Sequence, residues 1–158
     1  MEKELEQYLL KNKINYIIHK HNAVFTVAES SKDEQIINIP GLHCKTLFLK
    51  DDLGRVYLVG MPAHKRLDVK KLEKHLSVKK LKFGSVDELK EKTALAPGSV
   101  SIFGAIYSRD VVLIIDREVW DAEIVGFHPN VNTETMEIKH RDLERYYNSL
   151  DNKEIIAL

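Results

Sequence analysis

This chain has a single cysteine, no net charge and no long apolar run. Only one of the 158 residues is a cysteine, Cys44, which rules out an internal disulfide and a cysteine-based zinc cluster. No apolar run approaches the roughly 20 residues that a membrane-spanning helix needs. The charged N-terminus also lacks the apolar core of a signal peptide. We therefore expect a cytoplasmic protein without a membrane partner.

The overall charge gives no indication of nucleic-acid binding, because 24 lysines and arginines balance 24 aspartates and glutamates. The distribution of charge is more informative. The segment 64–82 contains eight basic residues against only Asp68 and Glu73. Such a local excess can neutralise phosphates, but lysines are equally common on solvated helix faces and sheet edges. Composition alone leaves both interpretations open.

The familiar catalytic signatures are absent as well. The chain has no Walker loop, no dinucleotide-binding glycine pattern, no Gly-x-Ser-x-Gly elbow and no paired-carboxylate motif. What it has is the segment 94–104, in which Pro97 fixes one backbone angle and Gly98 frees the next. Such a loop can hold N–H groups outward as a cradle for an ester carbonyl or a phosphate. Taken alone, the segment could equally be an ordinary connection.

Hydrophobic spacing and turn signals predict a mixture of helices and strands. Helices are expected over 2–11, 26–37, 68–76, from 85 onward and over 141–150; strands are expected over 14–18, 46–50, 55–61, 79–83, 110–116, 122–127 and 133–138. The run 110–116 is apolar on both faces, as in a central strand. Because the elements do not alternate regularly, we predict an α+β fold with a mixed sheet. No repeat or linker interrupts the chain, so residues 1–158 form one domain.

Three groups of side chains could carry chemistry. Lys45 begins an otherwise apolar strand, and a lysine at a strand end is usually just exposed to solvent. If Lys45 faces a pocket instead, its ammonium could bind a phosphate or a ribose hydroxyl. Cys44 could be a nucleophile with His128 as its base, but neighbouring strand residues face opposite sides, so Cys44 and Lys45 should not line one site. A small core residue is the better interpretation of Cys44.

The histidines differ in what they suggest. His19 and His21 share a strand face, but no third ligand completes a metal site, and we expect none. Pro129 favours an extended backbone at His128, whose imidazole could then orient a substrate or a water molecule.

Five segments, in order along the chain, resemble the YbaK-like editing domains, which are also found inserted in bacterial prolyl-tRNA synthetases. They are residues 21–29, 44–51, 65–68, 97–101 and 128–133. Within that superfamily the free-standing ProX type, a trans-acting editor, is the most similar, and the run 128–133 favours it over the cysteinyl-tRNA deacylase branch. The resemblance implies an α+β domain with a barrel-like mixed sheet surrounded by helices.

The resemblance also implies a function. It predicts a deacylase that hydrolyses the ester of a mischarged aminoacyl-tRNA, most simply alanine on proline tRNA, with no cofactor. Lys45 matches the family's functional lysine, which engages the terminal adenosine and holds the ester. Gly98 and Ser99 match the loop that binds the acyl carbonyl, and His128 matches the histidine beside the amino-acid pocket. Substrate-binding positions carried over in the same way are Val24, Phe25, Thr26, Pro97, Val100 and Ser101.

The implied partner is the acceptor end of aminoacyl-tRNA, with prolyl-tRNA synthetase or an elongation factor as further candidates. From the basic segment, the residues assigned to tRNA binding are Lys65, Arg66, Lys70 and Lys71. Two positions depart from the family pattern, which usually has glycine at Ala94 and proline at Ile102. These departures leave open a preference for serine or cysteine, and a non-catalytic tRNA- or synthetase-binding module is the alternative of a different class.

Overall fold

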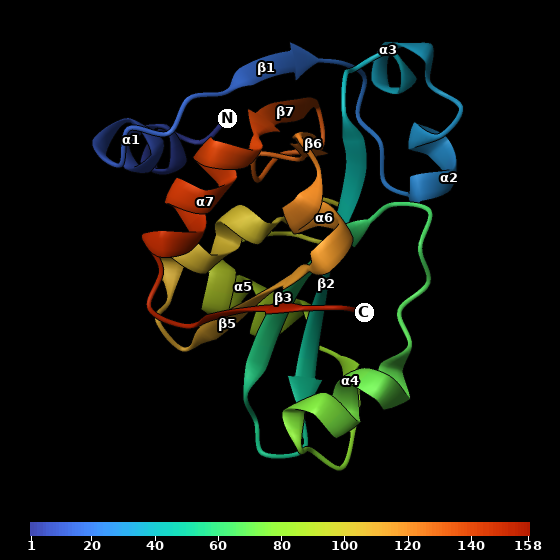
Figure 1. The fold of residues 1–158 in the computed structure, drawn as a ribbon, viewed down its shortest axis with the longest axis vertical. Helices are drawn as coiled ribbons and strands as arrows, with labels where there is room; N and C mark the ends of the chain where they lie inside the picture. Colours follow the sequence, from blue (N-terminus) through green and yellow to red (C-terminus); the bar gives the residue numbers. More distant parts are fainter.

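The computed structural model describes residues 1–158 as one mixed sheet with helices packed around it (Figure 1). The helices are α1 (Lys3–Lys11), α2 (Val27–Ser30), α3 (Glu34–Ile37), α4 (Val69–Leu76), α5 (Val86–Thr93), the 3-10 helix η1 (Ile102–Tyr107), α6 (Arg117–Asp121) and α7 (His140–Asn148). The strands are β1 (Ile17–Lys20), β2 (Leu42–Asp51), β3 (Val56–Pro62), β4 (Leu81–Phe83), β5 (Val111–Asp116), β6 (Ile124–Phe127), β7 (Glu134–Lys139) and β8 (Lys153–Ile156). None of the helices is long and apolar enough to cross a membrane.

The sheet is organised around the long strand β2. The strand order is β1-β7-β6-β2-β3-β5-β8, with β4 paired to β2 outside this path. On one edge β2 runs antiparallel to β3; on the other it pairs with β6 at Leu42 and His43 and with β4 from Leu49 to Asp51. Between these two pairings, residues 44–48 have no strand partner on that edge. This gap in the ladder positions the site described below.

Apolar side chains fill both faces of the sheet. The larger cluster joins the inner sides of α1, α5, η1 and α7 to one face of the sheet. In the smaller cluster, Leu72 of α4 packs on Tyr57 and Val59 on the other face. Strand β5 lies between β3 and β8 and is buried on both faces, which confirms the central strand predicted over 110–116. The mixed sheet and the α+β class are confirmed.

Local capping signals placed two helices correctly. The Asp68 side chain accepts the amide of Lys71 at the start of α4, and Ser85 forms a complete capping box with Glu88 at the start of α5. The single helix predicted over 26–37 is wrong, because α2 ends at Ser30. Ser30 and Ser31 donate their hydroxyls to the carbonyls three residues back, which competes with helix continuation.

Other boundaries differ for reasons of packing. The strand predicted from residue 14 begins only at Ile17, because Lys13 is left-handed and Ile14 folds back to donate its amide to Leu9 at the end of α1. The sequence patterns did not reveal η1, α6 or β8. All but the last two residues of η1 are buried and apolar, so it has no amphipathic period to detect.

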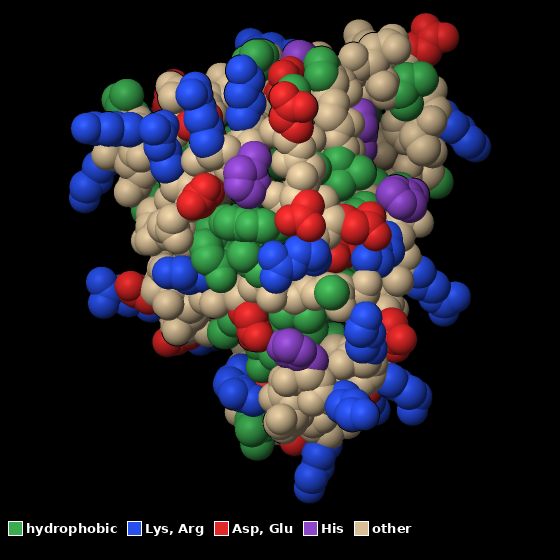
Figure 2. Space-filling model, in the orientation of Figure 1, with side chains coloured by type: hydrophobic (Ala, Val, Ile, Leu, Met, Phe, Trp, Pro, Cys, Tyr) green, Lys and Arg blue, Asp and Glu red, His purple; other side chains and the backbone are tan.

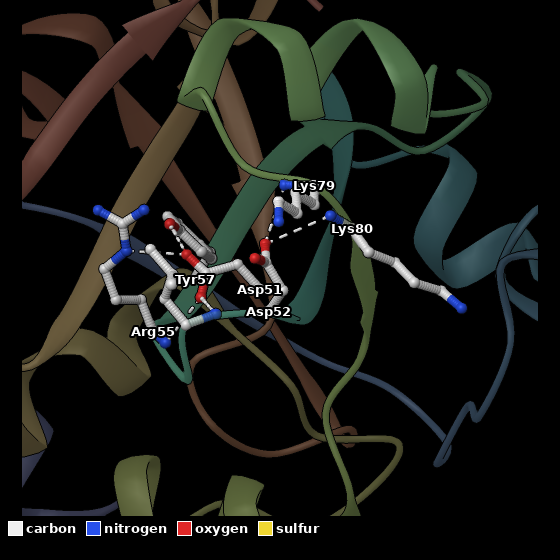
Figure 3. A network of polar contacts seen from close by, with 7 residues as sticks. Asp51, Asp52, Arg55, Tyr57, Lys79 and Lys80 are labelled. Carbon is white, nitrogen blue, oxygen red and sulfur yellow. Dashed lines mark hydrogen bonds and ion pairs between the residues drawn. The ribbon is translucent and has the colours of Figure 1, made fainter.

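A polar cluster holds the β2–β3 hairpin together (Figure 3). The carboxylate of Asp51 accepts hydrogen bonds from the Tyr57 hydroxyl at 2.6 Å and from the amide and guanidinium of Arg55 at 2.9 and 2.8 Å. Burial opposes ionisation of Asp51, but these donors outweigh it and lower its pKa. Asp52 accepts the amides of Lys79 and Lys80, which ties the hairpin to β4.

Ala94 ends α5 in the left-handed region, with φ of 59°. The glycine that the family usually has at this position would adopt this conformation without strain. Ile102, the other departure, is fully buried in η1, and its carbonyl accepts the Tyr146 hydroxyl at 2.6 Å. Neither side chain lines the pocket described below, so neither departure changes its walls directly.

Replacing Ala94 with glycine is expected to stabilise the protein by about 1 kcal/mol, because left-handed strain is removed while the unfolded chain gains some freedom. The free energy of unfolding in urea measures the change. The control is Ala96→Gly, two residues further on, where φ is not positive and the same substitution should destabilise. Equal shifts in the two variants would contradict the prediction.

Candidate active site

A pocket of about 240 Å³ opens at the unpaired stretch of β2. Its walls come from the segment leading into α2, from β2, from the Pro97–Gly98 loop and from the end of β6; α2 and α3 stand beside this part of β2 in Figure 1. Seven of the residues predicted for the site line it: Val24, Phe25, Thr26, Lys45, Gly98, Val100 and His128. The structure therefore brings together segments separated by more than 100 residues.

The backbone of β2 takes part in this pocket. The His43 carbonyl accepts the Ala63 amide on the β3 side, and the Phe48 carbonyl accepts the Gly84 amide on the opposite side. Because main-chain groups alternate in direction along a strand, the amide and carbonyl of Thr46 face the open edge. Thr46 lines the pocket. The edge thus offers a donor and an acceptor to a bound molecule.

Lys45 supplies the positive charge of the pocket. It is the only lysine or arginine in the lining, its side chain is half-buried, and no carboxylate lies within 4.0 Å of its ammonium. Burial without a compensating partner lowers the pKa of Lys45. An anionic or strongly polar ligand group would compensate this charge.

His128 is held in a defined tautomer. Its Nδ1 lies 2.8 Å from the Glu134 carbonyl, which can only accept, so Nδ1 carries the proton. Burial, together with the nearby His21, lowers the pKa of His128 despite that bond. The ring is therefore neutral near pH 7, and Nε2 has no partner in the protein. His128 can accept a proton or a hydrogen bond from a molecule in the pocket.

The Pro97–Gly98 loop carries free backbone donors. Gly98 uses the backbone freedom of glycine, with φ of 85°, and the amides of Gly98 and Val100 have no partner within the chain. The Ser99 amide donates to the Ala96 carbonyl at 3.0 Å, so the predicted carbonyl-binding role of Ser99 is corrected: its N–H closes a turn. Two amides, not a continuous run, are available to a ligand.

Two other predicted substrate contacts lie outside the pocket lining. Ser101 is fully buried, and its hydroxyl donates to the His128 carbonyl at 2.5 Å while accepting the Phe103 amide. It ties the loop to the histidine and cannot touch a substrate. Pro97 lines a neighbouring groove instead.

Most of the sequence matches a known family. A family model for the aminoacyl-tRNA editing domain matches residues 21–146, most of the chain. The chain belongs to the aminoacyl-tRNA editing domain family. The sequence-based assignment to this family is therefore confirmed, and membership places the protein among the editing hydrolases.

Relatives of the editing domain include the prolyl-tRNA editing protein ProX of Acetoanaerobium sticklandii, 35% identical over 84% of this chain and 82% of its own. A prolyl-tRNA synthetase associated domain-containing protein 1 from Danio rerio is 29% identical over 99% of this chain and 86% of its own. A crystal structure described as that of a candidate trans-editing enzyme for prolyl-tRNA synthetase shares the fold, with a TM-score of 0.77, 16% identity, and coverage of 100% and 98%.

Cys44 of this editing domain lines the pocket as well, contrary to the expectation that Cys44 and Lys45 would face different surroundings. At an open strand edge, the wall includes side chains from both faces of β2. The thiol packs on the main core and donates to the Leu42 carbonyl at 3.3 Å. Burial raises the pKa of Cys44, so it is a protonated thiol and a poor nucleophile.

The support behind His128 was not predicted from the sequence. His21 is not a strand histidine paired with His19; it lies past the end of β1, is buried, and its ring centroid is 5.9 Å from that of His128. Its Nδ1 donates to the Asn22 carbonyl, so its Nε2 accepts the Thr135 hydroxyl at 2.9 Å. His19 instead contacts Glu137 at 2.7 Å. The position of His21 as the first residue of the family segment 21–29 was the one available signal.

Lys65 requires a correction in its predicted role. Its ammonium is 2.9 Å from the buried carboxylate of Asp116 and 3.2 Å from Glu118, and these partners raise its pKa although burial opposes them. It anchors the loop before α4 and is not free to bind phosphate. Arg66, Lys70 and Lys71 are exposed and have no ion pair.

Proposed function

We propose that this protein is a trans-acting deacylase that hydrolyses mischarged aminoacyl-tRNA, with alanine on proline tRNA as its substrate. The observation that carries the proposal is the convergence of Lys45, His128 and two free amides on one pocket that has no activated nucleophile. An aminoacyl ester is already activated, so positioning and electrostatic stabilisation suffice for its hydrolysis.

The geometry suggests a division of labour. The Lys45 ammonium and the amides of Gly98 and Val100 would hold the acyl carbonyl and the negative charge that develops on it. His128 Nε2 would accept a hydrogen bond from the attacking water or from the neighbouring ribose hydroxyl. Water adds its oxygen to the acyl carbon, the bond to the ribose oxygen breaks, and that oxygen leaves with a proton. The products are the free amino acid and uncharged tRNA.

The size and lining of the pocket support a small amino acid. A volume of about 240 Å³ is below that of most ligand sites, and Val24, Ile36 and Phe127 form a buried apolar wall. Because one methylene is worth only about 1–3 kcal/mol of discrimination, serine and cysteine are the competing substrates. The names of the relatives, a prolyl-tRNA editing protein among them, support proline tRNA as the carrier.

The deciding experiment is a deacylation panel with alanine, serine, cysteine and proline each charged on proline tRNA. We expect alanine to be released fastest and proline to be spared. Faster release of serine or cysteine would overturn the alanine assignment but not the reaction class. Binding of tRNA without release of any of the four would favour the non-catalytic module.

The exposed basic side chains on and before α4 are proposed to contact the tRNA backbone. Lysine and arginine side chains project from the end of the molecule that α4 forms (Figure 2). Reversing the charge of Lys70 and Lys71 together is expected to weaken tRNA binding and to reduce the slope of log K against log salt by about 2. The control reverses Lys3 and Lys11 on α1. An unchanged slope in the first variant would refute this assignment.

A further inference from the structure

A second hollow adjoins the pocket on the other side of Gly98. This groove has a volume of about 280 Å³, and four of its lining residues, Thr46, Leu47, Gly98 and Val100, also line the pocket. The two hollows therefore share a wall. A molecule that fills the pocket and is larger than it can continue into the groove.

The most exposed large hydrophobic residue of the groove is an aromatic ring on a rigid base. Phe83 ends β4 with 70% of its surface exposed, opposite Leu49 of β2. The next residue, Gly84, donates its amide to the Phe48 carbonyl, and a Cβ there would lie 2.1 Å from the Phe48 ring. The backbone beside Phe83 is thus pressed onto a buried side chain, while the ring of Phe83 has no aromatic partner in the fold.

Three lysines lie in the segment that leads into this ring. Residues 79–88 contain Lys79, Lys80 and Lys82 against Asp87 and Glu88. Glu88 is paired with Lys50 at 2.6 Å, whereas the three lysines have exposed side chains and no ion pair. Figure 3 shows that Lys79 and Lys80 are fixed through their amides to Asp52, which leaves their ammonium groups free.

We propose that this groove binds the unpaired 3′ end of tRNA, with one nucleobase stacked on Phe83 and the adjoining phosphates near Lys82. The inference rests on the proposed function, which places the aminoacyl ester in the pocket; the nucleotide strand that carries the ester must leave over an adjacent surface. An exposed aromatic ring on a segment that also carries unpaired lysines is a combination that binds single-stranded nucleic acid.

The test compares Phe83→Ala with Phe83→Trp and with Leu53→Ala. Leu53 has the same exposed fraction, 70%, but lies in the β2–β3 turn outside both hollows. KM and kcat are measured for alanyl-tRNA and for 3′-O-alanyl-adenosine, an ester of one nucleoside. Binding of a short fluorescent RNA with the tRNA 3′ sequence is measured in parallel, because it reports on Phe83 even if no ester is hydrolysed.

Phe83→Ala is expected to weaken RNA binding and raise KM for alanyl-tRNA about tenfold, with kcat little changed, while Phe83→Trp retains both. If KM rises equally for alanyl-adenosine, the terminal base stacks on Phe83. If KM rises for alanyl-tRNA alone, a preceding base stacks there. Either result supports the proposal. Effects no larger than those of Leu53→Ala overturn it. The proposal is also overturned if the wild-type protein sediments as a dimer and Phe83→Ala dissociates that dimer while KM stays unchanged.

Discussion

Replacing Lys45 with alanine is expected to lower kcat/KM for deacylation roughly 100-fold or more and to leave the fold intact. Lys45 is the only lysine or arginine in the pocket lining and has no carboxylate partner. Its charge is therefore available to the ester and to the oxyanion that forms from it. Because burial of this uncompensated ammonium lowers its pKa and opposes folding, its removal should not reduce the melting temperature.

Two further variants separate charge from shape at this position. Lys45→Met keeps the length of the side chain without the ammonium and should be as inactive as the alanine variant. Lys45→Arg keeps the charge but replaces a compact donor with a wide planar one, so partial activity is expected. Lys139→Ala removes an exposed strand lysine outside the pocket and should be silent. Full activity of Lys45→Ala would refute the proposed role.

Local signals explain which parts of the fold were predictable. The caps of α4 and α5 depend on Asp68, Ser85 and Glu88, whose partners lie within three residues, and both helices begin where these signals place them. The break between α2 and α3 depends on serine hydroxyls competing for carbonyls, which hydrophobic spacing does not register. Strand β8 depends on parallel pairing with β5, a contact made between distant parts of the chain.

The same distinction applies to the site. Local sequence singled out Lys45, Gly98 and His128 as candidates, but only the family resemblance assigned them to one site, because nothing in their spacing shows that they meet. Their meeting depends on the gap between β6 and β4 along β2, which the register of both strands creates. Lys65 matched the family pattern yet is neutralised by Asp116, 51 positions away. A motif identifies a residue type, while only the fold determines whether its charge is free.

Replacing Gly98 with alanine is expected to reduce kcat/KM about 100-fold, because the loop that presents the free amides would have to move. Gly98 has φ of 85°, where alanine is strained by about 1–2 kcal/mol. Its new Cβ would also lie 3.0 Å from the Phe25 ring, tighter than ordinary contact. Relief of both strains shifts the Gly98 and Val100 amides away from the acyl carbonyl, so kcat should fall more than KM rises.

Gly54 provides a matched control for backbone strain. It has φ of 84° in the β2–β3 turn, and no atom lies within 4 Å of where its Cβ would be. Gly54→Ala should therefore cost a similar free energy of unfolding but leave deacylation unchanged. Equal losses of activity in the two variants would mean that stability, not amide placement, limits the reaction. A Gly98→Ala variant with normal kcat would show that the amides of this loop do not hold the ester.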